Sequence, residues 1–131
     1  MKSGNYKKAS FLLDRLYRNK ISRAKKEKLY IEYVKLVRKA AYAGDARAQF
    51  ELGQFYEDVN FLGLNKLHNP YKCFYWYSKA CEGNHAEACN SLGYCYDTGK
   101  GVKKNVRMAK KFYVKSVRLG SVLGKNNLKL M

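Results

Sequence analysis

Apolar residues recur at helical spacing along most of the chain, with polar positions between them. The stretch from 29 to 37 illustrates the pattern with its apolar members Leu29, Ile31, Val34, Leu36 and Val37. This spacing predicts seven helices, over residues 5–18, 24–43, 46–58, 70–82, 85–97, 104–119 and 121–129. No strand is predicted, and the single proline, Pro70, stands where the fourth helix should begin. The sequence therefore predicts an all-α fold.

Part of this pattern is an internal repeat. The segment 48–56 returns forty residues later as 88–96, and both copies read A-x-x-x-L-G-x-x-Y. A period of this size is typical of solenoids, in which each pair of helices buries its apolar face against its neighbours. We therefore expect one domain over residues 1–131, an α/α solenoid of about three helix-turn-helix repeats with a C-terminal capping helix.

The second helix of each unit also repeats, because residues 73–80 align with 109–116 at an offset of thirty-six. The two offsets differ because the loop inside the first unit, residues 59–69, is longer than the turn at 97–102 in the next. Asn69 precedes the first of these two helices and is predicted to be its N-cap, and Asn105 occupies the matching cap region one unit later.

These residues resemble the Sel1-like repeat, a relative of the tetratricopeptide repeat with a G-x-x-x-A-x-x-x-L-G-x-x-Y first helix and an A-x-x-W-Y-x-K-A-A second helix. One unit matches at Gly44, Ala48, Leu52, Gly53, Tyr56, Trp76, Tyr77, Lys79 and Ala80. The next matches at Asn84, Ala88, Leu92, Gly93, Tyr96, Gly99, Gly101, Val102, Ala109, Phe112, Tyr113 and Lys115, with asparagine in a glycine position. The resemblance divides the chain into a degenerate repeat at 1–43, repeats at 44–83 and 84–119, and a truncated capping repeat at 120–131.

The resemblance also implies a function, because such repeats usually serve as scaffolds for protein–protein interaction. On that basis we expect an adaptor, inhibitor or effector-type binder and no enzymatic activity. A short groove lined by the first helices of the units would hold the partner. Because one fold serves many functions, the side chains have to identify the partner.

Charge is distributed unevenly along the chain. The formal net charge is +17, with +10 in residues 1–39, −3 in residues 40–99 and +10 in residues 100–131. Sequence position maps onto position along a solenoid, so two basic poles should flank a mildly acidic middle. Such a field attracts acidic proteins or peptides. A solvated surface in a lysine-rich chain explains the same composition without any partner.

Four basic residues of the sixth predicted helix, Lys110, Lys111, Lys115 and Arg118, lie at the spacings of helical neighbours and are candidate binding residues. Nucleic acid is the alternative partner, since lysine and arginine contacts to phosphates give salt-sensitive affinity without sequence preference. The chain has no signature of a known nucleic-acid-reading module.

Aromatic residues supply two further candidates. Trp76, Tyr77 and Tyr96 occupy positions that the repeat uses for packing between helices. Tyr75 and Tyr94 lie outside the repeat pattern, so we expect them to contribute to a binding face.

Cysteines allow two interpretations. Cys81 and Cys89 flank the junction between units, where an antiparallel helix pair would bring them within reach of a disulfide. The arrangement is similar to the cysteine-rich branch of the family, secreted bacterial proteins that include binders of penicillin-like molecules and β-lactam hydrolases. The resemblance therefore implies β-lactam binding or hydrolysis as another alternative. Only one junction carries the pair and no signal peptide is evident, so the expectation is that all four cysteines are free thiols in a reducing cytosol. Cys73 and Cys95 could form a second link but are expected to be packed thiols.

The expected location follows from the N-terminal sequence. No signal peptide is evident, so we expect a cytoplasmic protein with reduced cysteines, and secretion by a route without a signal peptide is the alternative. No stretch approaches the ~18 uninterrupted apolar residues of a membrane span.

No catalytic or cofactor motif is recognised in the sequence. Cys81, His85 and Cys89 could approach one another, but they do not complete a familiar zinc ligand set. We therefore expect no catalytic residue, metal or cofactor, and His85 should cap a helix or lie at the surface.

Overall fold

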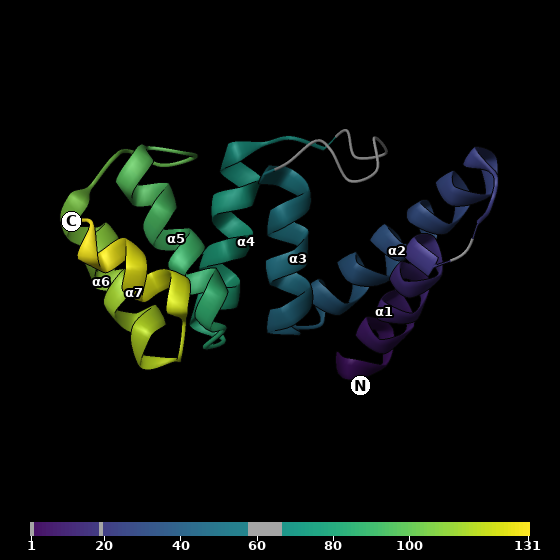
Figure 1. Cartoon of the computed structure of the whole chain (residues 1–131), viewed down its shortest axis with the longest axis horizontal. Coiled ribbons are helices and arrows are strands. Elements are labelled where there is room, and N and C mark those ends of the chain that lie inside the picture. Colours follow the sequence, from purple (N-terminus) through teal and green to yellow (C-terminus); the bar gives the residue numbers. More distant parts are fainter. Residues whose placement is uncertain (1, 19, 58–66) are drawn as a thin grey trace.

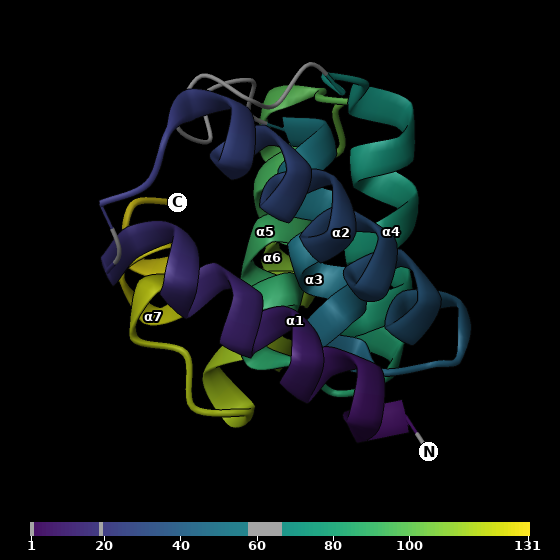
Figure 2. The same cartoon turned by 90° about the vertical axis from the view of Figure 1, so that its right-hand side faces the viewer.

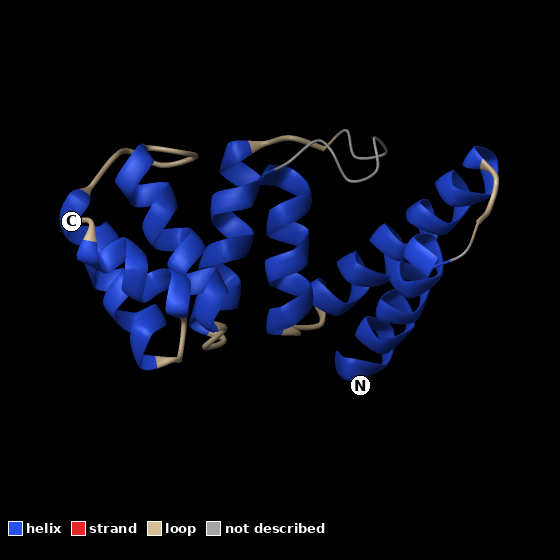
Figure 3. Ribbon diagram, viewed as in Figure 1, coloured by secondary structure: helices blue, strands red, loops and turns tan. Residues whose placement is uncertain are grey.

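The computed structural model describes residues 2–18, 20–57 and 67–131, and these residues form seven helices and no strand (Figure 3). The helices are α1 (Lys2–Arg18), α2 (Arg23–Tyr42), α3 (Ala46–Glu57), α4 (Pro70–Glu82), α5 (Ala86–Thr98), α6 (Val106–Arg118) and α7 (Val122–Lys129). Every predicted helix is present, with ends within three residues of the prediction. Residue 58, predicted as the last of the third helix, and most of the predicted loop 59–69 lie outside the described residues.

The helices stack in the order of the sequence. Each packs mainly against the helices before and after it, and α7 also touches α5. Figure 1 shows α1 and α2 at one end of the stack and α6 and α7 at the other. The two basic segments therefore lie at opposite ends, as expected for a solenoid, and the predicted all-α repeat architecture is confirmed.

Close contact between paired helices depends on two glycines of the repeat. A Cβ atom on Gly53 of α3 would lie 2.6 Å from the ring of Tyr77 on α4. One unit later, a Cβ atom on Gly93 of α5 would lie 2.6 Å from the ring of Tyr113 on α6. Both rings are buried. The first helix of each unit thus approaches the second at the point where only glycine leaves room for the tyrosine.

Both predicted N-caps are confirmed. The side-chain oxygen of Asn69 accepts hydrogen bonds from the backbone N–H groups of Tyr71 and Lys72 at the start of α4. Asn105 accepts from the N–H of Met108 at the start of α6. These bonds satisfy backbone donors that have no partner within the helix, which fixes where each second helix begins.

The turns between units require a left-handed backbone. Gly44, Asn84 and Gly120 occupy equivalent positions after α2, α4 and α6, with φ angles of 97°, 62° and 101°. Asn84 is the single non-glycine residue with positive φ in the described part of the chain. Asparagine thus replaces glycine at this turn, as the sequence predicted.

Candidate interaction surfaces

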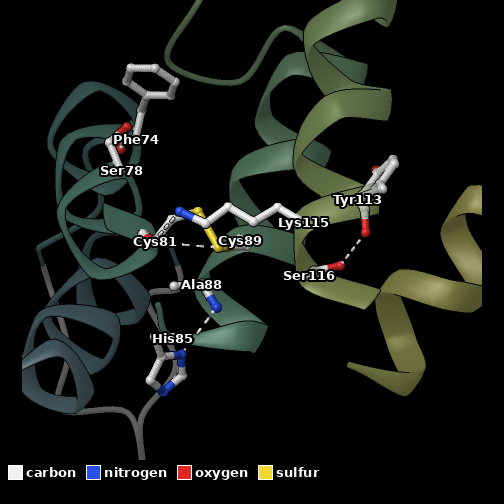
Figure 4. The surroundings of a disulfide bond; sticks show 9 residues. All are labelled: Phe74, Ser78, Cys81, His85, Ala88, Cys89, Tyr113, Lys115 and Ser116. Carbon is white, nitrogen blue, oxygen red and sulfur yellow. Dashed lines mark hydrogen bonds between the residues drawn. A yellow bond between two sulfur atoms is a disulfide. The ribbon is translucent and has the colours of Figure 1, made fainter. Parts of the chain in front are cut away.

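The basic residues predicted on α6 do not all have the same environment. Lys110, Lys111 and Arg118 are exposed. Lys115 is half-buried, and its Nζ atom donates a 2.9 Å hydrogen bond to the carbonyl of Cys81 (Figure 4). Because that carbonyl lies in the last turn of α4, Lys115 links α6 to the preceding unit. Three of the four predicted side chains are therefore free to meet a partner, while Lys115 also holds the stack together.

Tyr75 and Tyr94 are 51% and 45% exposed, so both can contact a partner. They lie in different surroundings. Tyr75, on a second helix, meets the edge of Trp76 with ring centroids 5.1 Å apart, and Lys79 lies over its ring. Tyr94, on a first helix, lies under the Nζ atom of Lys100 at 6.0 Å. The two tyrosines thus belong to different helix rows, and the structure gives no contact that joins them into one site.

The aromatic residues assigned to packing occupy the interior. Trp76 and Tyr77 are buried. Tyr96 is half-buried and stacks on Phe112 with centroids 5.7 Å apart, while Phe74 meets it edge-on at 5.4 Å. The packing prediction is confirmed for Trp76 and Tyr77, and Tyr96 joins α4, α5 and α6 at the edge of the core.

A polar cluster that sequence reasoning missed joins the first three helices. Glu51 on α3 accepts hydrogen bonds from the hydroxyls of Tyr6 on α1 and Tyr33 on α2, at 2.5 and 2.6 Å. Arg47 lies over the Tyr6 ring at 4.4 Å and pairs with Asp45 at 3.0 Å. The partners of Glu51 are 45 and 18 residues away in sequence, so no local signal reveals them.

The hydroxyls that bind Glu51 are good donors at neutral pH. Burial, followed by the hydrogen bond to Glu51, raises the pKa of Tyr6 to about 12. Burial and the Glu51 charge also raise the pKa of Tyr33. Both tyrosines therefore remain protonated, and the Glu51 carboxylate is satisfied within the protein.

A disulfide joins Cys81 and Cys89, with an S–S distance of 2.17 Å (Figure 4). The expectation of free thiols at this pair is therefore wrong. The tight turn at Asn84 sets the end of α4 beside the start of α5 and brings the two Cα atoms within 4.7 Å. That expectation relied on the reducing cytosol inferred from the sequence, whereas the geometry of the turn allows the bond.

The other two cysteines remain free and buried, as packed thiols. The hydrogen bond with Cys95 raises the pKa of the Cys73 thiol well above its usual range, and burial raises it further. Cys73 is therefore an inert packing residue at neutral pH.

His85 is the N-cap of α5, in agreement with one of its two expected roles. Its Nδ1 atom accepts a 3.1 Å hydrogen bond from the N–H of Ala88, and its ring stacks on Phe50 with centroids 4.6 Å apart. The neighbouring cysteines are joined to each other. Within the described residues, no group of three histidine, cysteine or acidic side chains is arranged to hold a metal ion.

The cap should make stability depend on pH. Burial lowers the pKa of His85 below its usual 6.5, because the neutral ring is favoured in the fold. The neutral ring stabilises the folded state fully above about pH 6.5, and this contribution is lost as pH falls through the lowered folded pKa. We expect the free energy of unfolding, measured in urea, to fall less between about pH 7.5 and about pH 5 in His85→Asn than in the parent protein. The asparagine amide can cap the helix but does not titrate.

His68→Asn is the matched control for this measurement. His68 is exposed, and its Nδ1 atom bonds the carbonyl of Glu57 at the end of α3, so replacing it leaves the His85 cap of α5 in place. This variant should lose as much stability on acidification as the parent protein. An equal loss in His85→Asn would show that another group is responsible.

No helix among the described residues has the length and hydropathy of a membrane span.

Comparison with known proteins supports the repeat assignment. A Sel1 repeat protein from Oxalobacter formigenes is 33% identical with a TM-score of 0.69, covering 76% of this chain and 72% of that one. Cysteine-rich protein B of Helicobacter pylori is 26% identical with a TM-score of 0.67, covering 98% of this chain and 97% of that one. A protective antigen of uropathogenic Escherichia coli with an SLR fold is 30% identical with a TM-score of 0.70, covering 78% of this chain.

The last relative is much longer, since the chain spans only 21% of its length. The family model for the Sel1 repeat matches residues 46–85 and 86–121, which is more than half of the chain. Sel1 repeat proteins are generally protein–protein interaction modules and are typically non-catalytic scaffolds. From its repeats, its fold and these relatives, the chain belongs to the Sel1 repeat family.

Proposed function

We propose that this protein is an interaction module for an acidic protein or peptide, which its basic ends attract and hold. The observation that carries the proposal is the placement of positive charge. Residues 1–39 and 100–131 each carry a net +10, and they form opposite ends of the stack. Charges of this kind accelerate association with a complementary partner and set its orientation.

The C-terminal end combines charge with apolar surface. Lys110, Lys111 and Arg118 are exposed on α6, and Val122 and Leu123 are exposed on α7. Residues 100–131 include no aspartate or glutamate. An apolar contact surrounded by charge is the usual composition of a protein–protein interface, so this end offers both affinity and steering.

The middle of the stack is less suited to an acidic partner. The first helices α3 and α5 together carry one arginine and four carboxylates: Arg47, Glu51, Glu57, Glu87 and Asp97. An acidic segment lying wholly along these helices would meet like charge. We therefore place the main contacts at the ends and treat the row of first helices as the surface that connects them.

The disulfide also supports a proposal about location. Disulfides persist in oxidising compartments and are rare in the reducing cytosol. We propose that the protein works outside the reducing cytosol, in place of the cytoplasmic location expected from the sequence.

Charge reversal at one end tests the proposed function. Partners would be recovered from nuclease-treated native lysate, and their association with the protein followed by surface plasmon resonance. Lys110→Glu with Lys111→Glu should slow association by about tenfold and flatten its salt dependence, with dissociation changed less. Lys72→Glu with Lys79→Glu is the matched control, because it makes the same charge change at exposed positions in the middle. An equal effect of the two double variants would contradict steering by the end.

Nucleic acid remains the alternative partner, and the same variant distinguishes it. For a nucleic-acid binder, reversal would lower affinity for unrelated sequences about equally and reduce the slope of log affinity against log salt by ~0.7–0.9 per lost phosphate contact. Nanomolar, sequence-selective binding of nucleic acid at physiological salt would contradict the proposal of a protein partner.

A further inference from the structure

Among the described residues, no other helix covers the outer face of the first hairpin. Helices α1 and α2 form one end of the stack, and Figure 2 shows them nearest the viewer with no element in front of them. Two shallow hollows lie on this hairpin. One of about 480 Å³ lies between α1 and α2, and one of about 420 Å³ runs along α2. Both hollows include Glu32 and Leu36, so they adjoin on α2, and we call the two together the end groove.

Apolar side chains line this end groove. Phe11 is 64% exposed and Ile31 is 67% exposed, while Leu12 and Leu36 lie deeper, packed on the core. Terminal units of solenoids normally present a polar outer face to water, because no further repeat covers them. Apolar residues gathered in a groove at such an end are typical of a binding surface.

The rim of the end groove is basic. The lining residues include five lysines and one carboxylate, Glu32; the lysines are Lys7, Lys8, Lys28, Lys35 and Lys39. An occupant must therefore bring negative charge beside its apolar residues. A second copy of the chain does not meet this requirement, because both of its ends carry a net +10.

The shape of the end groove favours a helix. It follows α2 from Lys28 to Lys39, which is three helical turns or about 16 Å. An amphipathic helix can place apolar side chains at i, i+3, i+4 and i+7 into such a groove. A flat lipid surface would reach Phe11 and Ile31 but leave Leu12 and Leu36, at the floor, uncovered.

Glu32 adds a requirement for register. It lies where the two hollows meet, so a wholly acidic occupant would face like charge at the centre of the groove. A lysine or another donor at the middle of the bound segment would remove this conflict. We propose that the end groove binds an acidic amphipathic helix of about three turns, with one donor side chain opposite Glu32. This inference rests on the proposed function and names the surface and the kind of segment that binds there.

A synthetic peptide tests the inference with the full chain. The probe is a helix-forming peptide of about 14 residues with leucines at i, i+3, i+4 and i+7, a central lysine and glutamates elsewhere. A scrambled peptide of the same composition is its control. We expect saturable binding of the probe at physiological salt by fluorescence anisotropy, and Phe11→Ser with Ile31→Ser should weaken it at least about tenfold.

Matched variants separate this end from the other. Val122→Ser with Leu123→Ser removes two exposed apolar side chains at the C-terminal end and should leave peptide affinity unchanged. Thermal unfolding checks that each variant is folded. Glu32→Lys should lower the affinity for the probe peptide. A peptide with glutamate in place of the central lysine should bind this variant more tightly than it binds the parent protein. That reciprocal effect would not arise from a general loss of structure.

Several outcomes would overturn the inference. These are equal binding of the scrambled peptide, no saturable binding of the probe up to about 1 mM, and hydrogen-exchange protection confined to α6 and α7. If the protein binds phosphatidylserine vesicles but not the peptide, and Phe11→Ser with Ile31→Ser weakens the vesicle binding, the surface binds lipid. If a recovered protein partner binds the Phe11→Ser, Ile31→Ser variant with unchanged affinity, the end groove is excluded while the proposed function stands.

Discussion

Replacement of Gly93 by leucine is expected to lower the free energy of unfolding by roughly 1–3 kcal/mol or more, because the side chain overpacks the contact between α5 and α6. Its Cβ atom alone would lie 2.6 Å from the Tyr113 ring and 3.2 Å from the carbonyl of Ala109. Tyr113 is buried, so its ring cannot move aside without disturbing the core. Gly53→Leu should have a comparable effect through Tyr77. Urea unfolding followed by circular dichroism measures both changes.

Gly4→Leu is the matched control for the two substitutions. Gly4 lies in α1, and a Cβ atom there would meet nothing within 4 Å. Leucine should leave stability unchanged or raise it by up to about 1 kcal/mol, because it has the higher helix propensity. Unchanged unfolding of both the Gly53 and Gly93 variants would contradict the close approach of the helices.

Reduction of the Cys81–Cys89 disulfide is expected to lower the free energy of unfolding by about 2–3 kcal/mol. The bond closes a short loop, with a sequence separation of 8, and so restricts the unfolded chain. Reductant should destabilise the parent protein and have no effect on Cys81→Ala with Cys89→Ala. Cys73→Ala with Cys95→Ala should still respond to reductant, since these cysteines are free.

Alkylation of cysteines in rapidly quenched native lysate checks the same bond in its natural setting. After denaturation without reductant, Cys73 and Cys95 should be labelled, whereas Cys81 and Cys89 should become labelled only after reduction. Labelling of all four before reduction would show that the disulfide is absent in the cell. It would also contradict the proposed location outside the reducing cytosol.

The features predicted correctly from the sequence depend on local chemistry or on the repeat. Asn69 and Asn105 cap the helices that follow them, and Asn84 replaces glycine in a left-handed turn. Gly53 and Gly93 lie where the repeat brings helices together. In each case the cause lies within a few residues or is duplicated one unit away, so the pattern reveals it.

Features that escaped prediction depend on contacts between distant segments. Glu51 accepts hydrogen bonds from tyrosine hydroxyls on two other helices, and Lys115 donates a hydrogen bond to a carbonyl 34 residues earlier in the chain. Periodicity also cannot tell that Phe11 and Ile31 remain exposed, because it does not reveal which hairpin face lacks a neighbour. Tyr75 and Tyr94 are exposed, as a binding role requires, but the repeat pattern alone does not show whether side chains on different helix rows meet in one site.

The sequential stacking of helices has a consequence for how the protein folds as it is synthesised. Its main packing interfaces join helices adjacent in the chain, and the contact between α5 and α7 spans only one intervening helix. Each hairpin can therefore form its packing contacts soon after it leaves the ribosome, because these contacts do not require a distant segment of the chain. The first hairpin, α1 with α2, would be complete while the later units are still being made.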